Sequence, residues 1–150
     1  ERGPFIDSFA CASIIGLKSS HRFSNIMRAV IEGLCMASRD CYLAMGTIPS
    51  EIRLAGGASQ SKSLRKIFSS ILKASVRTSN RNEPGAAGAA MIGAMSVGVY
   101  KDWDKCLSEW VNPLLGDLEE YDNKLADKYN QLFELYLKSR SSVSPLWSKL

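Results

Sequence analysis

The sequence predicts a helix-rich α/β domain, and three observations in the middle of the chain support this prediction. Residues 51–55 and 75–78 read as two short strands, and an amphipathic helical pattern lies between them. A further helix starts at Pro84, since helices tolerate proline at their first position. The order strand, helix, strand, helix is typical of two parallel strands joined by a helical crossover. The apolar positions of the first of these helices are Leu64, Ile67, Phe68, Ile71 and Leu72.

The composition fits one ordinary globular domain. The chain has 150 residues, of which 45% are hydrophobic and 23% charged. Its net charge of +4 is spread along the chain, so no basic cluster favours a nucleic-acid partner. The four cysteines form no Cys-x-x-Cys pair and there is one histidine, so the spacing of a metal site is missing. We therefore expect reduced thiols and a cytoplasmic location.

A long helix is predicted before the first strand. Apolar residues recur at spacings of three and four after Ser20, which we take as the N-cap, and Gly46 and Pro49 follow its end. Arg28 and Glu32 have the spacing of an i,i+4 ion pair. The residues before Ser20 are expected to be irregular or extended. The predicted apolar face consists of Phe23, Ile26, Val30, Leu34, Ala37 and Cys41.

The last third of the chain is predicted to be helical. Asp102 is expected to cap a short helix that ends at Asn112-Pro113. Asp117 and Glu120 have capping-box spacing before a second helix, whose start is acidic and whose end is basic. The stripe predicted for that helix is Leu118, Tyr121, Leu125, Tyr129, Leu132 and Tyr136, with Lys138 and Arg140 at its end.

The helix after Pro84 is unusually rich in small residues. Gly85, Ala89 and Gly93 recur on one face, and no charge occurs from Pro84 to Tyr100. Such a helix lets another backbone approach closely. A membrane span fits poorly, because the run is short, rich in Gly and Ala, and lacks basic flanks. We expect a buried helix packed against a sheet.

Two adjacent glycines, Gly56 and Gly57, end the apolar run of "IRLAGGASQS" at residues 52–61. Such a turn between a strand and a helix can bring bare backbone and helix amides to a ligand such as the adenosine half of a nucleotide. The alternative is a plain turn that needs a positive φ, and the pattern alone favours this alternative. The stretch matches neither G-x-x-x-x-G-K-[ST] nor G-x-G-x-x-G.

No catalytic constellation stands out. His21 lies at a helix start without an evident acidic partner, so we expect it to be exposed or to cap that helix. Glu119, Glu120 and Asp122 are most simply a solvated helix start. Lys62, Arg65 and Lys66 could meet a phosphate, but a solvated helix face is the favoured interpretation.

Three stretches taken together resemble the signatures of the FGGY carbohydrate kinases. Residues 12–32 resemble the second family signature, residues 52–72 resemble the adenosine motif, and residues 82–102 resemble the Glu-x-x-x-x-Gly-Ala-Ala helix that follows it. "ERGPFIDS" at residues 1–8 resembles the segment that leads into the signature, so the resemblance covers residues 1–105. The matching positions are Ala12, Ile14, Gly16, Leu17, Asn25, Ile26, Ala29, Val30, Ile31, Glu32, Glu83, Gly88, Ala89 and Ala90.

The resemblance implies an ATP-dependent sugar or polyol kinase built from two actin-like (ribonuclease-H-like) domains. This chain would be part of the second, nucleotide-binding domain, truncated at its N-terminal side. Within residues 1–150, residues 1–105 would form the motif-bearing core and residues 106–150 the C-terminal helices. Gly56 and Gly57 would lie against adenosine and Ser61 would touch the base or ribose. The catalytic Asp and the main Mg²⁺ ligands would lie outside this segment.

From this resemblance we expect ATP or ADP and a sugar or polyol as partners, a homo-oligomer, and neither nucleic acid nor membrane. The chain starts with Glu rather than Met, and we expect a segment of a longer enzyme that is inactive alone. The alternative is a non-catalytic actin-like module that binds nucleotide or partners. A third and weaker alternative is a small membrane-associated helical protein. The sequence leaves the identity of the sugar or polyol open.

Overall fold

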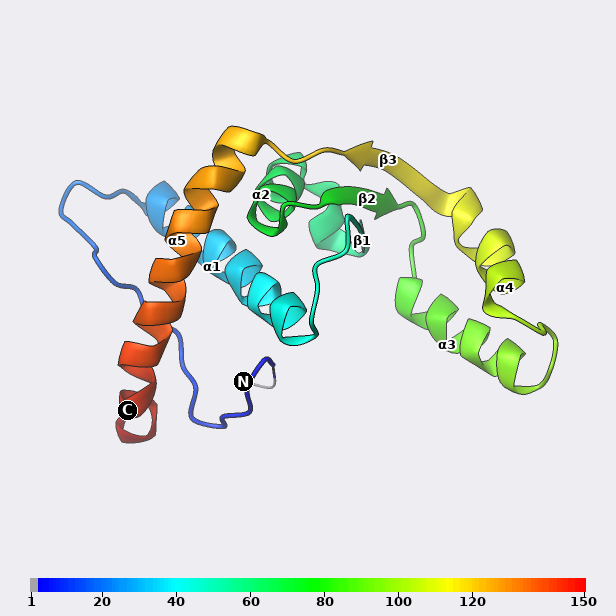
Figure 1. The fold of residues 1–150 in the computed structure, drawn as a ribbon, viewed down its shortest axis with the longest axis horizontal. Helices are drawn as coiled ribbons and strands as arrows, with labels where there is room; N and C mark the ends of the chain where they lie inside the picture. Colours follow the sequence, from blue (N-terminus) through cyan, green and yellow to red (C-terminus); the bar gives the residue numbers. More distant parts are fainter. Residues whose placement is uncertain (1–2) are drawn as a thin grey trace.

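The centre of the fold is a small mixed sheet joined to a group of helices (Figure 1). The computed structural model describes residues 3–150, apart from the side chain of Ala58. The elements are α1 (Phe23–Ala44), β1 (Glu51–Leu54), η1 (Gly57–Gln60), α2 (Lys62–Leu72), β2 (Ser75–Ser79), α3 (Pro84–Ser96), α4 (Trp103–Trp110), η2 (Asn112–Leu114), β3 (Leu115–Glu119), α5 (Asn123–Val143) and η3 (Ser144–Lys149).

The strands confirm the predicted parallel pair and add a strand that the sequence did not predict. β1 pairs with β2 in parallel, with Ile52 beside Val76. β3 pairs with β2 in antiparallel orientation, so the order in the sheet is β1-β2-β3 and β1 lies at an edge. Ile52 and Val76 are buried, whereas β3 is half-buried or exposed along its length. A strand with so little apolar patterning gives no signal in the sequence.

α2 behaves as its amphipathic pattern predicts. Ile67, Ile71 and Leu72 are buried, and Ser61 caps the start of the helix. The core to which α2 contributes lies between α1, α2 and α5, which are grouped beside the sheet (Figure 1). The buried members of that core are Cys35, Met36, Ile67, Ile71, Tyr129 and Phe133.

The predicted apolar face of α1 is wrong in part, because three of its six residues are exposed. Phe23, Val30 and Leu34 are 75%, 44% and 66% exposed, whereas the buried Cys35 and Met36 face the core. The core-facing side of α1 also carries charged residues, so the pattern of apolar residues in the sequence does not identify this side. Arg28, for example, pairs with Glu32 there at 2.7 Å, as the i,i+4 spacing predicts, and both contact the hydroxyl of Tyr129. Their partners on another helix compensate for their partial burial.

Two predicted helix starts are also wrong. α1 begins after Arg22 rather than Ser20, and Asn25 Oδ1 accepts a hydrogen bond from the Arg22 N–H at 2.9 Å. α5 begins after Asp122, whose carboxylate accepts from the Leu125 N–H, whereas Asp117 lies in β3. On α5 the buried residues are Ala126, Tyr129 and Phe133, while Leu132, placed on the predicted stripe, is 43% exposed.

The small-residue helix α3 does not pack against the sheet, which corrects the prediction of a buried helix. In Figure 1, α3 and α4 lie beyond one end of the strands, away from α1, α2 and α5. Of the described residues of α3, Ala87 alone is buried. The cap of α4 follows the prediction, since Asp102 accepts a hydrogen bond from the Lys105 N–H at 2.8 Å. Within residues 3–150, no helix combines the length and apolarity that crossing a membrane requires.

Candidate functional site

The two glycines lie where β1 ends and η1 begins, on the connection to α2. The carboxyl ends of parallel strands lie along the same side of a sheet, and open α/β sheets bind ligands just beyond these carboxyl ends. β2 also ends on this side, and residues 80–83 connect it to the start of α3. The site therefore has the glycine turn on one side and the start of α3 on the other.

The neighbouring glycines differ in their backbone conformation. Gly56 has φ +84°, in the left-handed region that favours glycine, so the turn itself requires a glycine at this position. Gly57 does not have a positive φ. The plain-turn explanation thus accounts for Gly56 but gives no reason for a glycine at residue 57.

Packing within the chain does not require Gly57 either. Both glycines are exposed, and a Cβ built on either residue would meet no heavy atom within 4 Å. The bare backbone at Gly57 therefore faces open space. A group that approaches from outside the described chain would benefit from this missing Cβ.

Ser59 fixes the shape of the glycine turn. Its backbone N–H and its hydroxyl both donate to the carbonyl oxygen of Gly56, at 3.1 Å and 2.7 Å. The side chain is almost completely buried, at 1% exposed. Two short-range hydrogen bonds to one oxygen hold Gly56 and η1 in one arrangement, so the open face is preformed.

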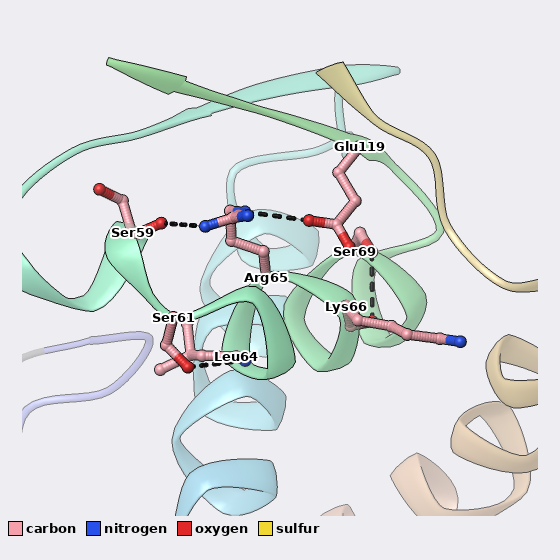
Figure 2. Close-up of polar contacts among 7 residues, drawn as sticks. All are labelled: Ser59, Ser61, Leu64, Arg65, Lys66, Ser69 and Glu119. Atoms are coloured by element: carbon pink, nitrogen blue, oxygen red, sulfur yellow. Dashed lines mark hydrogen bonds and ion pairs between the residues drawn. The ribbon is translucent and has the colours of Figure 1, made fainter. Parts of the chain in front are cut away.

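Ser61 follows as the N-cap of α2. Its hydroxyl oxygen accepts a hydrogen bond from the Leu64 N–H at 3.3 Å, and the residue is exposed (Figure 2). The hydroxyl hydrogen stays available as a donor. The structure thus gives Ser61 a structural role on the same connection as the glycines, and a ligand contact at Ser61 stays a prediction.

Arg65 corrects the expectation of a solvated basic face on α2. Its guanidinium donates through Nη1 to the Ser59 carbonyl at 2.6 Å and through Nε to Glu119 Oε2 at 2.9 Å (Figure 2). Lys66 matches the expectation better, because it forms an exposed ion pair with Asp122 at 3.2 Å. Sequence reasoning missed the Arg65 contact with Glu119 because the two residues lie 54 positions apart and β3 was not predicted.

The three acidic residues expected to form one solvated helix start have separate roles. Glu119 ends β3 and binds Arg65, Glu120 accepts a hydrogen bond from the Ser75 hydroxyl at 2.6 Å, and Asp122 caps α5. The bonds from the backbone of Leu125 and from Lys66 hold the pKa of Asp122 below its ordinary value. His21 is exposed, and its Nδ1 accepts the Lys18 N–H at 3.1 Å.

The glycine turn is an open surface rather than an enclosed pocket. A cavity of about 400 Å³ lies between α1, α2 and α5, and another of about 500 Å³ lies between the N-terminal segment, α1 and α5. Neither is lined by Gly56, Gly57 or Ser61. Within residues 3–150, no group of three or more His, Cys, Asp or Glu side chains could hold a metal ion.

Solved structures establish the class of fold. The chain superimposes on the crystal structure of a ligand-bound xylulose kinase from Lactobacillus acidophilus with a TM-score of 0.86 and 24% sequence identity. The match covers 99% of this chain and 30% of that one. The predicted fold class, a helix-rich part of an actin- and hexokinase-like (ribonuclease-H-like) domain, is therefore confirmed.

The sequence comparisons identify the family. Residues 1–97 match the model of the C-terminal domain of the FGGY family of carbohydrate kinases, and the chain belongs to this family. It is 50% identical to the erythritol kinase of Brucella abortus (strain 2308) over all 150 residues, and 32% identical over 111 residues to a glycerol kinase of Parabacteroides distasonis. The latter match covers 71% of this chain. The chain spans 29% and 22% of the lengths of these two relatives.

Proposed function

We propose that the whole protein is an ATP-dependent kinase of a sugar or polyol hydroxyl and that this chain supplies the adenosine side of its ATP site. The observation that carries the proposal is the bare backbone of Gly57, which neither φ nor packing within the chain explains. A flat purine ring, or the ribose attached to it, can approach closely where no Cβ projects. Membership of the FGGY family supports the kind of nucleotide and the reaction.

The described residues fit a nucleoside better than they fit the reacting groups. Gly56 and Gly57 offer a preformed open wall at the carboxyl edge of the parallel strands, and Ser61 offers a hydroxyl at the start of α2. ATP supplies the phosphoryl group, whose transfer requires positioning and charge neutralisation. This chain's own contribution is to bind and orient the nucleoside.

Metal binding and the chemical step are assigned to residues outside this segment. We propose that the main Mg²⁺ ligands belong to parts of the whole enzyme outside this segment, as the family resemblance implies. We therefore propose that residues 1–105 form the motif-bearing core of a C-terminal kinase domain, that residues 106–150 complete it, and that the isolated chain phosphorylates no sugar or polyol.

Erythritol is the substrate to test first. The similarity to the erythritol kinase is 50% over the full chain, compared with 32% over a shorter match to the glycerol kinase. The polyol would bind mainly to parts of the enzyme outside this chain. Phosphorylation of erythritol and of glycerol by the whole enzyme, measured side by side, would distinguish these substrates.

The Gly57→Val substitution in the whole enzyme tests the adenosine wall. A branched side chain would occupy the space that the nucleoside needs, so the KM for ATP should rise about tenfold, with little change in the KM for the polyol. Gly33→Val is the matched control, because an added Cβ there also meets nothing within 4 Å and α1 is distant in sequence from the turn.

Unchanged KM values for ATP in Gly57→Val would contradict the assigned role. An enzyme that binds ADP in isothermal titration but phosphorylates no sugar or polyol would instead support the non-catalytic actin-like module. Turnover by the purified 150-residue chain would contradict the assignment of the chemistry to residues outside it.

A further inference from the structure

We propose that Arg65 is a positioning residue for the ATP site, which holds the glycine turn in place through Ser59 and is itself anchored by Glu119 of β3. This inference rests on the proposed function of the glycine turn and adds a residue to it. It also gives β3, which lies in the last third of the chain, a role in nucleotide binding.

A continuous series of hydrogen bonds connects β3 to the glycine turn. Glu119 Oε2 accepts from Arg65 Nε, and Arg65 Nη1 donates to the carbonyl oxygen of Ser59. Ser59 in turn donates twice to the carbonyl oxygen of Gly56. Figure 2 shows Arg65 between Ser59 and Glu119, with its guanidinium reaching both. A displacement of the guanidinium is therefore transmitted to the turn through Ser59.

Burial makes these contacts stronger than those of an ordinary surface ion pair. The side chains of Arg65 and Glu119 are 20% and 21% exposed, whereas those of Lys66 and Asp122 are 53% and 38% exposed. Charge-assisted hydrogen bonds in a partly desolvated site resist exchange with water. The Ser59 carbonyl thus has a fixed donor instead of a fluctuating solvent molecule.

The geometry requires arginine at this position. Two different nitrogens of one planar group reach two acceptors on different elements, η1 and β3. A lysine has a single ammonium group on a flexible stem and cannot reproduce this fixed fork. The anchor Glu119 lies beyond residues 1–97, which match the family model.

Another Arg–Glu pair in the same sheet provides a matched control. Arg77 of β2 binds Glu51 of β1 through two hydrogen bonds of 3.0 Å and 3.1 Å. Their side chains are 28% and 36% exposed, and neither contact includes a residue of η1. Neutralising Glu51 therefore perturbs an ion pair between strands without releasing the turn.

The test compares Glu119→Gln and Glu51→Gln in the whole enzyme. Glu119→Gln should raise the KM for ATP about fivefold and leave the KM for the polyol near its original value, because it weakens a charge-assisted contact behind the turn. Arg65→Lys should have a similar effect, and combining Arg65→Lys with Glu119→Gln should add little. Glu51→Gln should leave the KM for ATP unchanged, even if it lowers the melting temperature as much as Glu119→Gln does.

Hydrogen exchange provides a readout that does not depend on activity. The Ser59 amide, which donates to Gly56, should exchange faster in Glu119→Gln than in the original enzyme, and Glu51→Gln should not change it. Equal exchange rates and equal KM values for ATP in the two glutamine variants would overturn the inference. An enzyme without ATP-dependent phosphorylation would contradict the proposed function, whereas the exchange rates would still decide whether Arg65 holds the turn.

Discussion

At the scale of single residues, Gly56 and Gly57 show how identical neighbours serve different purposes. Gly56 is required by the chain itself, because its φ of +84° is costly for residues with a Cβ. Gly57 has no such requirement and faces open space. The sequence could locate the pair but could not separate the two causes, since φ is a property of the folded turn.

The two causes predict opposite outcomes for alanine substitutions. Gly56→Ala should lower the free energy of unfolding by about 1–2 kcal/mol, because alanine is strained at a positive φ. Gly57→Ala should leave the free energy of unfolding nearly unchanged. Urea denaturation of the two variants of the whole enzyme measures the difference, and equal stabilities would contradict the distinction between the two glycines.

Arg65 shows the limit of sequence reasoning at this scale. Arg65 and Lys66 have the same charge and adjacent positions on α2, so composition and periodicity treat them alike. The structure separates them by their partners, the half-buried Glu119 and the more exposed Asp122. Glu119 is brought near Arg65 by β3, which has no recognisable strand pattern in the sequence. No local signal could therefore reveal the contact between Arg65 and Glu119.

At the scale of elements, the sequence predicts those whose apolar pattern is simple. α2 has one apolar stripe, and its buried Ile67, Ile71 and Leu72 all belong to the predicted face. α1 exposes several apolar residues on one side and packs through the side of the buried Cys35 and Met36, where Arg28, Glu32 and Arg39 contact α2 and α5. A pattern of apolar residues does not reveal a core-facing side on which charged and apolar residues are mixed.

Tyr129 illustrates such a contact between helices. It lies on α5, is 2% exposed, donates its hydroxyl to Glu32 at 2.7 Å and accepts from Arg28 at 3.0 Å. Burial, together with the bond to Glu32, raises the pKa of Tyr129 from 10.0 to about 12. The neutral hydroxyl therefore holds α5 against α1 throughout the physiological range of pH.

Tyr129→Phe should lower the free energy of unfolding by about 1 kcal/mol while leaving the KM for ATP unchanged, because the hydroxyl joins two helices away from the turn. The hydroxyl's contribution is fully present below pH 10.0 and is lost as the pH rises through about 12, because the folded-state pKa is raised. The difference in the free energy of unfolding between Tyr129→Phe and the original enzyme should decrease between pH 10.0 and about 12. Denaturation curves recorded at several pH values measure this decrease.

The matched control is Tyr100→Phe. Tyr100 donates its hydroxyl to Glu109 of α4 at 2.7 Å in an exposed contact, and it accepts from Trp110 Nε1 at 2.9 Å. Its loss should change the free energy of unfolding by less than about 0.5 kcal/mol. Equal losses for the two variants would contradict the role assigned to the buried Tyr129.

At the scale of the whole molecule, the chain leaves much of its apolar surface uncovered. Phe23, Met27, Val30 and Leu34 recur along one side of α1 and are 43% to 75% exposed. β1 lies at an edge of the sheet, and α3 has little contact with the rest of the described chain beyond α4. Exposed apolar faces and open strand edges are surfaces that associate in water.

We therefore expect the isolated 150-residue chain to self-associate, with the exposed side of α1 as the main contact. Replacing both Val30 and Leu34 by Glu places charges in that face, so light scattering should show a smaller mass for this variant than for the original chain. Leu135→Glu is the control, because Leu135 is 59% exposed on α5 and lies outside the α1 face. A monomeric original chain would contradict the expectation, and association that persists in the α1 variant would assign it to the edge of β1 or to α3 instead.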